Sequence, residues 1–217
     1  MRLVLAAATL AALAACGDSE PKPEQDPTTS GPEEPAAVEL VPTPPDALRA
    51  CRRSPLLRRA CPQQVPEAPF DPDSEIYQAH VFPSGPGGTR TFNLSWGGEY
   101  PRPERNRPPA LVHIVLVGGR PLGPLEGIDI PQPRRAELRD GLLHRSRGRA
   151  LSFGTALWHG LRGRLLLAPP YPRGGIMGNH LVFRWRDGKR EYALSLHAWE
   201  PLTETAETLR RVVASAP

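Results

Sequence analysis

The dipeptide Asp187-Gly188 lies between two runs in which apolar and polar side chains alternate. Such a dipeptide is typical of a two-residue type I′ turn, so the two runs are predicted to pair as an antiparallel hairpin in which Arg186 pairs with Lys189. This register places Phe183 opposite Tyr192. One face then collects side chains that we expect to form core: Leu181, Phe183, Trp185, Tyr192, Leu194 and Leu196. The other face collects Arg184, Arg186, Lys189, Glu191 and Ser195.

The segment after this hairpin, residues 201–215, is predicted to be an amphipathic helix. Its apolar side chains recur at helical spacing: Leu202, Ala206, Leu209 and Val213. Glu204 and Glu207 come early and Arg210 and Arg211 come late, which matches the charge preference of the helix dipole. We expect this helix to pack on the sheet.

Four further segments are predicted to be strands: residues 89–96, 110–117, 149–155 and 161–168. The second is apolar throughout and is expected to be a central strand, within which His113 is expected to be a hydrogen-bonded core residue. The predicted fold class is α+β: an antiparallel or mixed sheet of five to seven strands, with a C-terminal amphipathic helix packed on one face. The predicted hairpin and the helix that follows it resemble the C-terminal part of small α+β domains in exported bacterial lipoproteins and sensor-type extracytoplasmic modules. This resemblance implies no particular binding residue.

The chain begins with Arg2 and an apolar run, Leu3–Ala15, which is shorter than the roughly 20 residues that a membrane-spanning helix needs. The run is therefore predicted to be a signal peptide over residues 1–15. Its end, Leu13-Ala14-Ala15-Cys16, resembles the lipobox of bacterial lipoprotein precursors. The resemblance implies that Cys16 becomes the first residue of the mature chain and carries acyl chains such as palmitate, which anchor it outside a bacterial membrane. The alternative is an ordinary secretory signal and a soluble periplasmic or secreted protein.

Residues 17–47 hold eight prolines, eight acidic residues and one lysine, and few large apolar side chains. Such a segment buries too little apolar surface to fold, so residues 16–47 are predicted to be a disordered spacer behind the lipidated cysteine. Residues 48–217 are long enough for one domain. This domain has 25 of the 27 basic and 15 of the 23 acidic side chains, a net charge of +10. Candidate partners are anionic lipid, a cell-wall polymer or another envelope protein; nucleic acid is not expected outside the cell.

Two cysteines remain, Cys51 and Cys61, and we expect them to form a disulfide because export favours oxidation. Between them, Ser54 can cap a helix whose first residue is Pro55, so a short helix is predicted inside the disulfide loop. The spacing does not match a zinc or redox motif.

The sequence contains none of the G-x-S-x-G, H-E-x-x-H, P-loop or G-x-G-x-x-G motifs, and no catalytic residue is assigned. His180, predicted to lie opposite Ser195, shares the polar hairpin face with His197, near Trp199 and Glu200. The two imidazoles could hold zinc or assist a hydrolysis, or they could simply pack at the surface. The other histidines with no ligand motif around them are His80, His144 and His159.

Gly174 and Gly175 could offer backbone amides to an anion, although such glycines commonly serve turns. The binding candidates are therefore Arg184, Arg186, Gly174 and Gly175. Two functions follow: a noncatalytic, membrane-anchored envelope module that binds an unidentified ligand, for which no cofactor is expected, or a metal- or histidine-assisted envelope hydrolase. The sequence favours the first.

Overall fold

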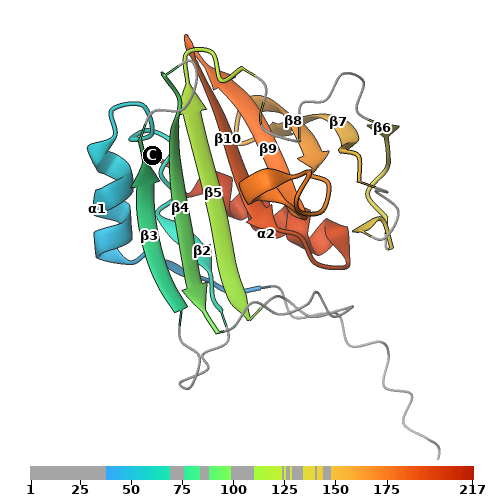
Figure 1. The fold of residues 1–217 in the computed structure, drawn as a ribbon, viewed down its shortest axis with the longest axis horizontal. Coiled ribbons are helices and arrows are strands. Elements are labelled where there is room, and N and C mark those ends of the chain that lie inside the picture. Colours follow the sequence, from blue (N-terminus) through green and yellow to red (C-terminus); the bar gives the residue numbers. More distant parts are fainter. Residues whose placement is uncertain are drawn as a thin grey trace, which may run out of the picture. The chain divides into compact units, whose positions relative to one another are not determined.

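The computed structural model places the hairpin of β9 (His180–Asp187) and β10 (Arg190–His197) at the centre of one large sheet (Figure 1). The structure describes residues 38–68, 76–83, 88–98, 110–123, 125, 128, 134–139, 141–143 and 148–217. The other strands of the sheet are β3 (Ile76–Phe82), β4 (Arg90–Gly97), β5 (Leu111–Gly119), β6 (Arg134–Arg135), β7 (Leu151–Trp158) and β8 (Leu161–Leu167). Their spatial order is β3-β4-β5-β10-β9-β8-β7-β6. Only β6 and β7 pair in parallel, so the sheet is mixed.

The predicted number of five to seven strands is too low, because eight strands pair in this sheet. The sequence pattern does not predict β3 or β6. β3 lies at the sheet edge and has no fully buried position, and β6 has two residues, both exposed. Short or exposed edge strands carry little of the apolar patterning on which strand prediction depends.

The β9–β10 hairpin is confirmed, but its turn lies one residue later than predicted. Asp187 pairs with Arg190, which leaves Gly188 and Lys189 as the two loop residues. Gly188 has a φ of 58°, whereas Lys189 is not among the residues with positive φ. A glycine at the first central position is typical of a type II′ turn, while the predicted type I′ turn needs positive φ at both positions.

The change of turn moves every pairing in the hairpin by two residues along the partner strand. Phe183 lies opposite Leu194 instead of Tyr192, and His180 lies opposite His197 instead of Ser195. Because side chains alternate with a period of two, this shift leaves each residue on its predicted face.

The predicted apolar face of the hairpin belongs to the larger of two hydrophobic cores. Helix α2 (Leu202–Ala214) packs on this face, as predicted, with the predicted residues Leu209 and Val213 in the core, and it lies behind the sheet in Figure 1. The same core includes Cys51 from α1 (Pro45–Arg53) and Val65 from β2 (Gln64–Pro66), which pairs with β1 (Leu40–Pro42). Each fully buried Leu or Phe stabilises such a core by about 1.5–3 kcal/mol. Within the described residues, neither helix combines the length and apolar character needed to cross a lipid bilayer.

The opposite face of the sheet carries a smaller core. Segments that follow β5 and β8 cover it, including Leu122 and Met177, the latter from the short helix η3 (Gly175–Met177). The buried apolar residues of this core are Val115, Val117, Leu122, Leu125, Ile128, Leu166, Ala168, Met177, Val182 and Ala193. The hairpin face that was predicted to be polar is therefore partly buried.

The Cys51–Cys61 disulfide is confirmed, with the two Cα atoms 6.0 Å apart. The helix predicted to begin at Pro55 is wrong: α1 carries Cys51 in its last turn and ends at Arg53, and residues 55–60 form turns. The proline at the start of the helix is Pro45, not Pro55, and the same preference for proline at the first helical position explains it. β1 and the start of α1 also lie N-terminal to residue 48, within the range expected to be a spacer.

Candidate metal centre

Three histidines form a row across three adjacent strands on the face with the smaller core. His180 on β9 is the direct cross-strand partner of His197 on β10. On the other side of β10, the pairing of Leu196 with Ile114 on β5 brings His113 beside His197. The order of the row is therefore His113, His197, His180, and the strand pairing itself holds the three backbones together.

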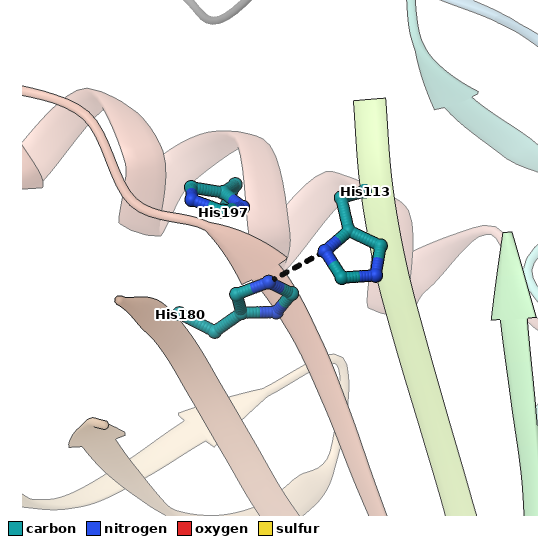
Figure 2. A group of neighbouring side chains, drawn as sticks. All are labelled: His113, His180 and His197. Atoms are coloured by element: carbon teal, nitrogen blue, oxygen red, sulfur yellow. Dashed lines mark hydrogen bonds between the residues drawn. The ribbon is translucent and has the colours of Figure 1, made fainter. Parts of the chain in front are cut away.

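Figure 2 shows the three imidazole rings gathered between β5, β9 and β10, with a dashed line joining the ring nitrogens of His113 and His180 that lie within hydrogen-bond distance. The ring centroids of His180 and His197 are 4.8 Å apart, and those of His113 and His180 are 4.7 Å apart. One nitrogen from each ring lies within 4.8 Å of the others. These separations place three potential metal ligands at one point of the sheet.

A chain of four short contacts runs through this cluster from Val115 on β5 to Asn93 on β4. Ser195 Oγ lies 3.2 Å from the carbonyl oxygen of Val115 and 2.9 Å from His180 Nδ1. His180 Nε2 lies 3.0 Å from His113 Nδ1, and His113 Nε2 lies 2.7 Å from Asn93 Oδ1. All four are hydrogen-bond distances.

The chain has fewer protons than contacts. With the Asn93 amide turned so that Oδ1 faces His113, both end atoms, this oxygen and the Val115 carbonyl oxygen, are acceptors, and the Ser195 hydroxyl and each neutral imidazole supply one proton apiece. Three protons therefore serve four contacts. When Ser195 donates to Val115, His180 Nδ1–H donates to Ser195. When His113 Nε2–H also donates to Asn93, the nitrogens His113 Nδ1 and His180 Nε2 present lone pairs to each other.

Both rings are then oriented as metal-binding histidines usually are. A metal-binding histidine donates its second N–H to a protein oxygen, which sets the tautomer and directs the other nitrogen at the ion. Asn93 accepts this bond from His113, and Ser195 accepts it from His180. At a zinc–nitrogen distance of about 2.0–2.1 Å, two ligands of a tetrahedral zinc lie about 3.3 Å apart. The separation between His113 Nδ1 and His180 Nε2 is close to that value.

The three imidazoles are neutral at neutral pH. Burial lowers the pKa of His113 to about 4, with a further contribution from the charge of His197. Burial lowers the pKa of His197 to about 4, and it lowers that of His180 well below the ordinary range, again helped by the neighbouring histidines. Neutral imidazole is the form that binds a metal.

The described residues add no carboxylate or thiolate to the cluster, because its possible ligand atoms come from the three histidines. Trp199 and Glu200, predicted to lie near His197, are buried just before α2, and Thr205 bonds both the N–H and the carbonyl of Trp199; the Glu200 carboxylate is not among the ligand atoms of the cluster. Cys51 and Cys61 are joined to each other. The cluster is therefore a centre of nitrogen donors.

The two predicted arginine candidates lie further along the same face. Arg184 Nη2 donates to Glu191 Oε2 at 3.1 Å and to the carbonyl oxygen of Gly123 at 3.1 Å. Arg186 forms an ion pair with the other oxygen of Glu191. Both residues thus belong to one basic surface, separate from the histidine row.

The glycine candidates lie in the loop between β8 and β9, and their amides bond within it. The N–H of Gly174 donates to Pro170, and that of Gly175 donates to Pro172. Gly175 has a φ of 54°, and a Cβ at Gly174 would lie 2.1 Å from the Pro169 carbonyl oxygen. Both glycines are required by the tight backbone of this loop. Neither backbone amide is available to bind an anion, because each donates its N–H within the loop.

The remaining predicted residues lie elsewhere. Cys16 and His144 fall outside the described residues, so the structure says nothing of either. His80 is exposed on edge strand β3, and His159 in the β7–β8 turn accepts a hydrogen bond from Arg210 on α2. Of the two histidines singled out from the sequence, His180 and His197, the structure brings both into the cluster.

Sequence reasoning missed three members of this site: His113 as a candidate ligand, and Asn93 and Ser195 as its hydrogen-bonding support. The expectation that His113 is a hydrogen-bonded core residue is confirmed, since it is 6% exposed and bonded to Asn93. Alternation places Asn93 and Ser195 on the polar side of their strands, whereas His113 lies in a strand that is apolar on both faces. What the sequence lacks is a signal that β5 neighbours β10.

Comparisons of the chain with protein-family models, with curated proteins and with solved structures find no match.

Proposed function

We propose that this protein is a membrane-anchored extracytoplasmic module that binds a divalent transition-metal ion through His113, His180 and His197. The observation that carries the proposal is the convergence of three neutral imidazoles from adjacent strands, with one nitrogen of each within 4.8 Å of the others. With Asn93 Oδ1 facing His113, the proton count supports it further. An ion bound by His113 Nδ1 and His180 Nε2 removes the need for a proton between them, so three protons then serve the three remaining contacts.

The donor set favours zinc and its neighbours among the first-row metals. Imidazole nitrogen suits Zn²⁺, Cu²⁺ and Ni²⁺, whereas Mg²⁺ and Ca²⁺ prefer oxygen ligands. Three histidines leave a fourth tetrahedral position for water or another ligand. We take Zn²⁺ as the probe ion and Mg²⁺ as the ion that should not bind.

Binding, rather than catalysis, is the function that the site favours. His113 is 6% exposed and His180 is fully buried, which leaves a substrate little access to the centre. The cluster within the described residues also lacks a carboxylate to act as a general base. The hydrolase that the sequence allowed therefore gains no supporting observation.

The cellular placement is part of the proposal and rests on the leader. The lipobox-like end of the apolar run supports acylation of Cys16. The Cys51–Cys61 disulfide supports an oxidising compartment, because such bonds persist outside the cytoplasm. Replacing Cys16 with serine should release the protein from the membrane fraction and remove the mass of the acyl chains. Membrane retention at unchanged mass would contradict the anchor.

Metal binding is tested on the full chain after treatment with a chelator, by calorimetric titration with Zn²⁺ and by elemental analysis after dialysis. The wild type should bind one Zn²⁺ per chain, and His197→Gln should weaken binding by at least about 100-fold. The matched control is His80→Gln, which removes an exposed histidine from β3 and should leave the affinity unchanged. Circular dichroism confirms that each variant is folded. Absence of zinc binding in the wild type, or equal affinities of the two variants, would refute the metal site.

A further inference from the structure

A basic hollow lies on the same face of the sheet as the histidine row, over β7, β8 and β9. Its volume is about 290 Å³, and its charged lining residues are Arg162, Arg164, Arg184, Arg186 and Glu191. Four arginines and one glutamate give this lining a net charge of +3. Thr155 on β7 adds a hydroxyl at the side of the hollow, directly opposite Arg164.

Strand pairing forces these arginines together. Arg164 on β8 is the direct partner of Arg184 on β9. The next pair along, Gly163 with Trp185, sets Arg162 beside Arg186 in the same way. Like charges at directly opposed positions destabilise a sheet, since their Cβ atoms are about 4.5–5.5 Å apart. An anion between the guanidinium groups would remove this repulsion.

Glu191 on β10 relieves only part of the repulsion. Its two carboxylate oxygens bond Arg184 and Arg186, and Oε2 also accepts the N–H of Leu122. These contacts hold both arginines in place on the sheet. Arg162 and Arg164 are exposed and, within the part of the chain that the structure describes, form no ion pair or side-chain hydrogen bond. Two oriented arginines and two available ones thus surround one hollow.

We propose that this hollow binds a phosphate group, held by Arg162, Arg164 and the exposed Arg186, with Arg184 adding positive charge at its base. The planar guanidinium fork matches phosphate oxygens in a bidentate geometry, and several such forks on a rigid sheet can surround one tetrahedral oxyanion. The site is distinct from the histidine cluster and does not depend on metal binding. The group can belong to free phosphate or to an anionic lipid headgroup, and the test separates these two sources.

Inorganic phosphate is titrated into the full-length wild-type chain at low ionic strength and followed by calorimetry. Charge-assisted hydrogen bonds contribute about 1.5–3 kcal/mol each, so Arg164→Gln should weaken phosphate binding by about tenfold or more. The matched control is Arg49→Gln, which removes the same charge from an exposed position on α1. It should change the affinity by less than about twofold, as expected for a distant screened charge.

Vesicles of phosphatidylglycerol and of phosphatidylcholine form the second arm. The wild type should bind inorganic phosphate. If Arg164→Gln weakens this binding and Arg49→Gln does not, the result supports a phosphate site in the hollow. When phosphatidylglycerol vesicles show the same dependence on Arg164, the natural source includes lipid headgroups. Vesicle binding without any binding of inorganic phosphate would overturn the proposal, because a diffuse basic surface would then explain it. Equal effects of the two substitutions, or no binding in either arm, would also overturn it.

Glu191→Gln distinguishes binding in the hollow from general attraction of phosphate to a basic protein. The Glu191 carboxylate lowers the positive charge of the hollow and repels phosphate, so the variant with a neutral amide should bind inorganic phosphate several-fold more tightly than the wild type. The same substitution at an exposed glutamate, Glu67→Gln, raises the net charge equally and should have no comparable effect. Equal gains from both substitutions would argue against the hollow.

Discussion

His113 Nδ1 on β5 lies 3.0 Å from His180 Nε2 on β9, although the two residues are 67 positions apart in the sequence and β10 pairs between their strands. The strands of these two residues are not paired with each other. The contact exists because both side chains lie on the same face of the sheet, on the two strands that flank β10. This geometry makes the histidine cluster sensitive to changes in any of three strands.

Zinc should stabilise the folded protein. A ligand that binds only the native state adds about 2.7 kcal/mol at a free concentration 100 times its dissociation constant. Thermal unfolding of the chelator-treated chain, followed by circular dichroism with and without Zn²⁺, should therefore show a rise in Tm. Mg²⁺ should leave Tm unchanged. A Tm shift of equal size in His197→Gln would show that zinc acts at some other site.

Asn93 should support the affinity of the centre without contacting the ion. Its Oδ1 accepts the hydrogen bond from His113 Nε2, and loss of such a partner typically costs 10–100-fold in metal affinity. Asn93→Leu should therefore weaken zinc binding by about that factor. Asn93→Asp keeps an acceptor of the same shape and should retain at least the wild-type affinity. If the two variants bind zinc equally, Asn93 has no orienting role.

The Cys51–Cys61 disulfide should stabilise the fold by constraining the unfolded chain. The cysteines are 10 positions apart, and a loop of that length corresponds to about 2–3 kcal/mol in the entropic description. Urea denaturation of the double variant Cys51→Ala, Cys61→Ala should show a loss of this size. Reducing agent should destabilise the wild type similarly and have no effect on the double variant, which serves as the control.

Glu191 should make stability depend on acidic pH. Burial opposes its ionisation, but hydrogen bonds from Arg186, the Leu122 amide and Arg184 outweigh burial and lower its pKa to about 2. A carboxyl group with a lowered pKa in the folded state contributes its full stabilisation above its unfolded pKa of about 4.3 and loses it as the pH falls toward 2.

The free energy of unfolding of the wild type should therefore exceed that of Glu191→Gln at pH 6, and the difference should shrink between about pH 4.3 and 2. Urea denaturation at a series of pH values measures it. Glu67→Gln controls for the loss of one exposed negative charge. A wild-type advantage over Glu191→Gln that persists unchanged from pH 5 to pH 2.5 would contradict the role of the two arginine contacts.

Much of the secondary structure could be predicted because it depends on local patterns. The apolar character of β5, the alternation along β4 and the helical spacing of α2 each lie within one segment. The errors also have local causes. A type II′ turn replaced the expected type I′ turn at Gly188, and α1 began at Pro45 rather than Pro55 because both prolines satisfy the same preference.

The candidate site was only half predictable. His180 and His197 were found because they lie at the two free ends of one hairpin, where turn and alternation bring them together. The predicted register placed Ser195 opposite His180, whereas the structure pairs Ser195 with Val182 and still bonds its hydroxyl to His180 Nδ1. The shift of two residues leaves each side chain on its predicted face of the sheet. His180 and His197 were therefore predicted to share a face even though the predicted register was wrong.

By itself, the sequence determined which face of its strand each side chain occupies, because a strand alternates with a period of two whatever its neighbours are. It also determined the spacing of Cys51 and Cys61. Only the tertiary structure decided that β5 pairs with β10, and therefore that His113 joins His180 and His197. Strand order depends on which apolar faces pack best over the whole chain, and that balance of long-range contacts and chain entropy leaves no local signature in the sequence.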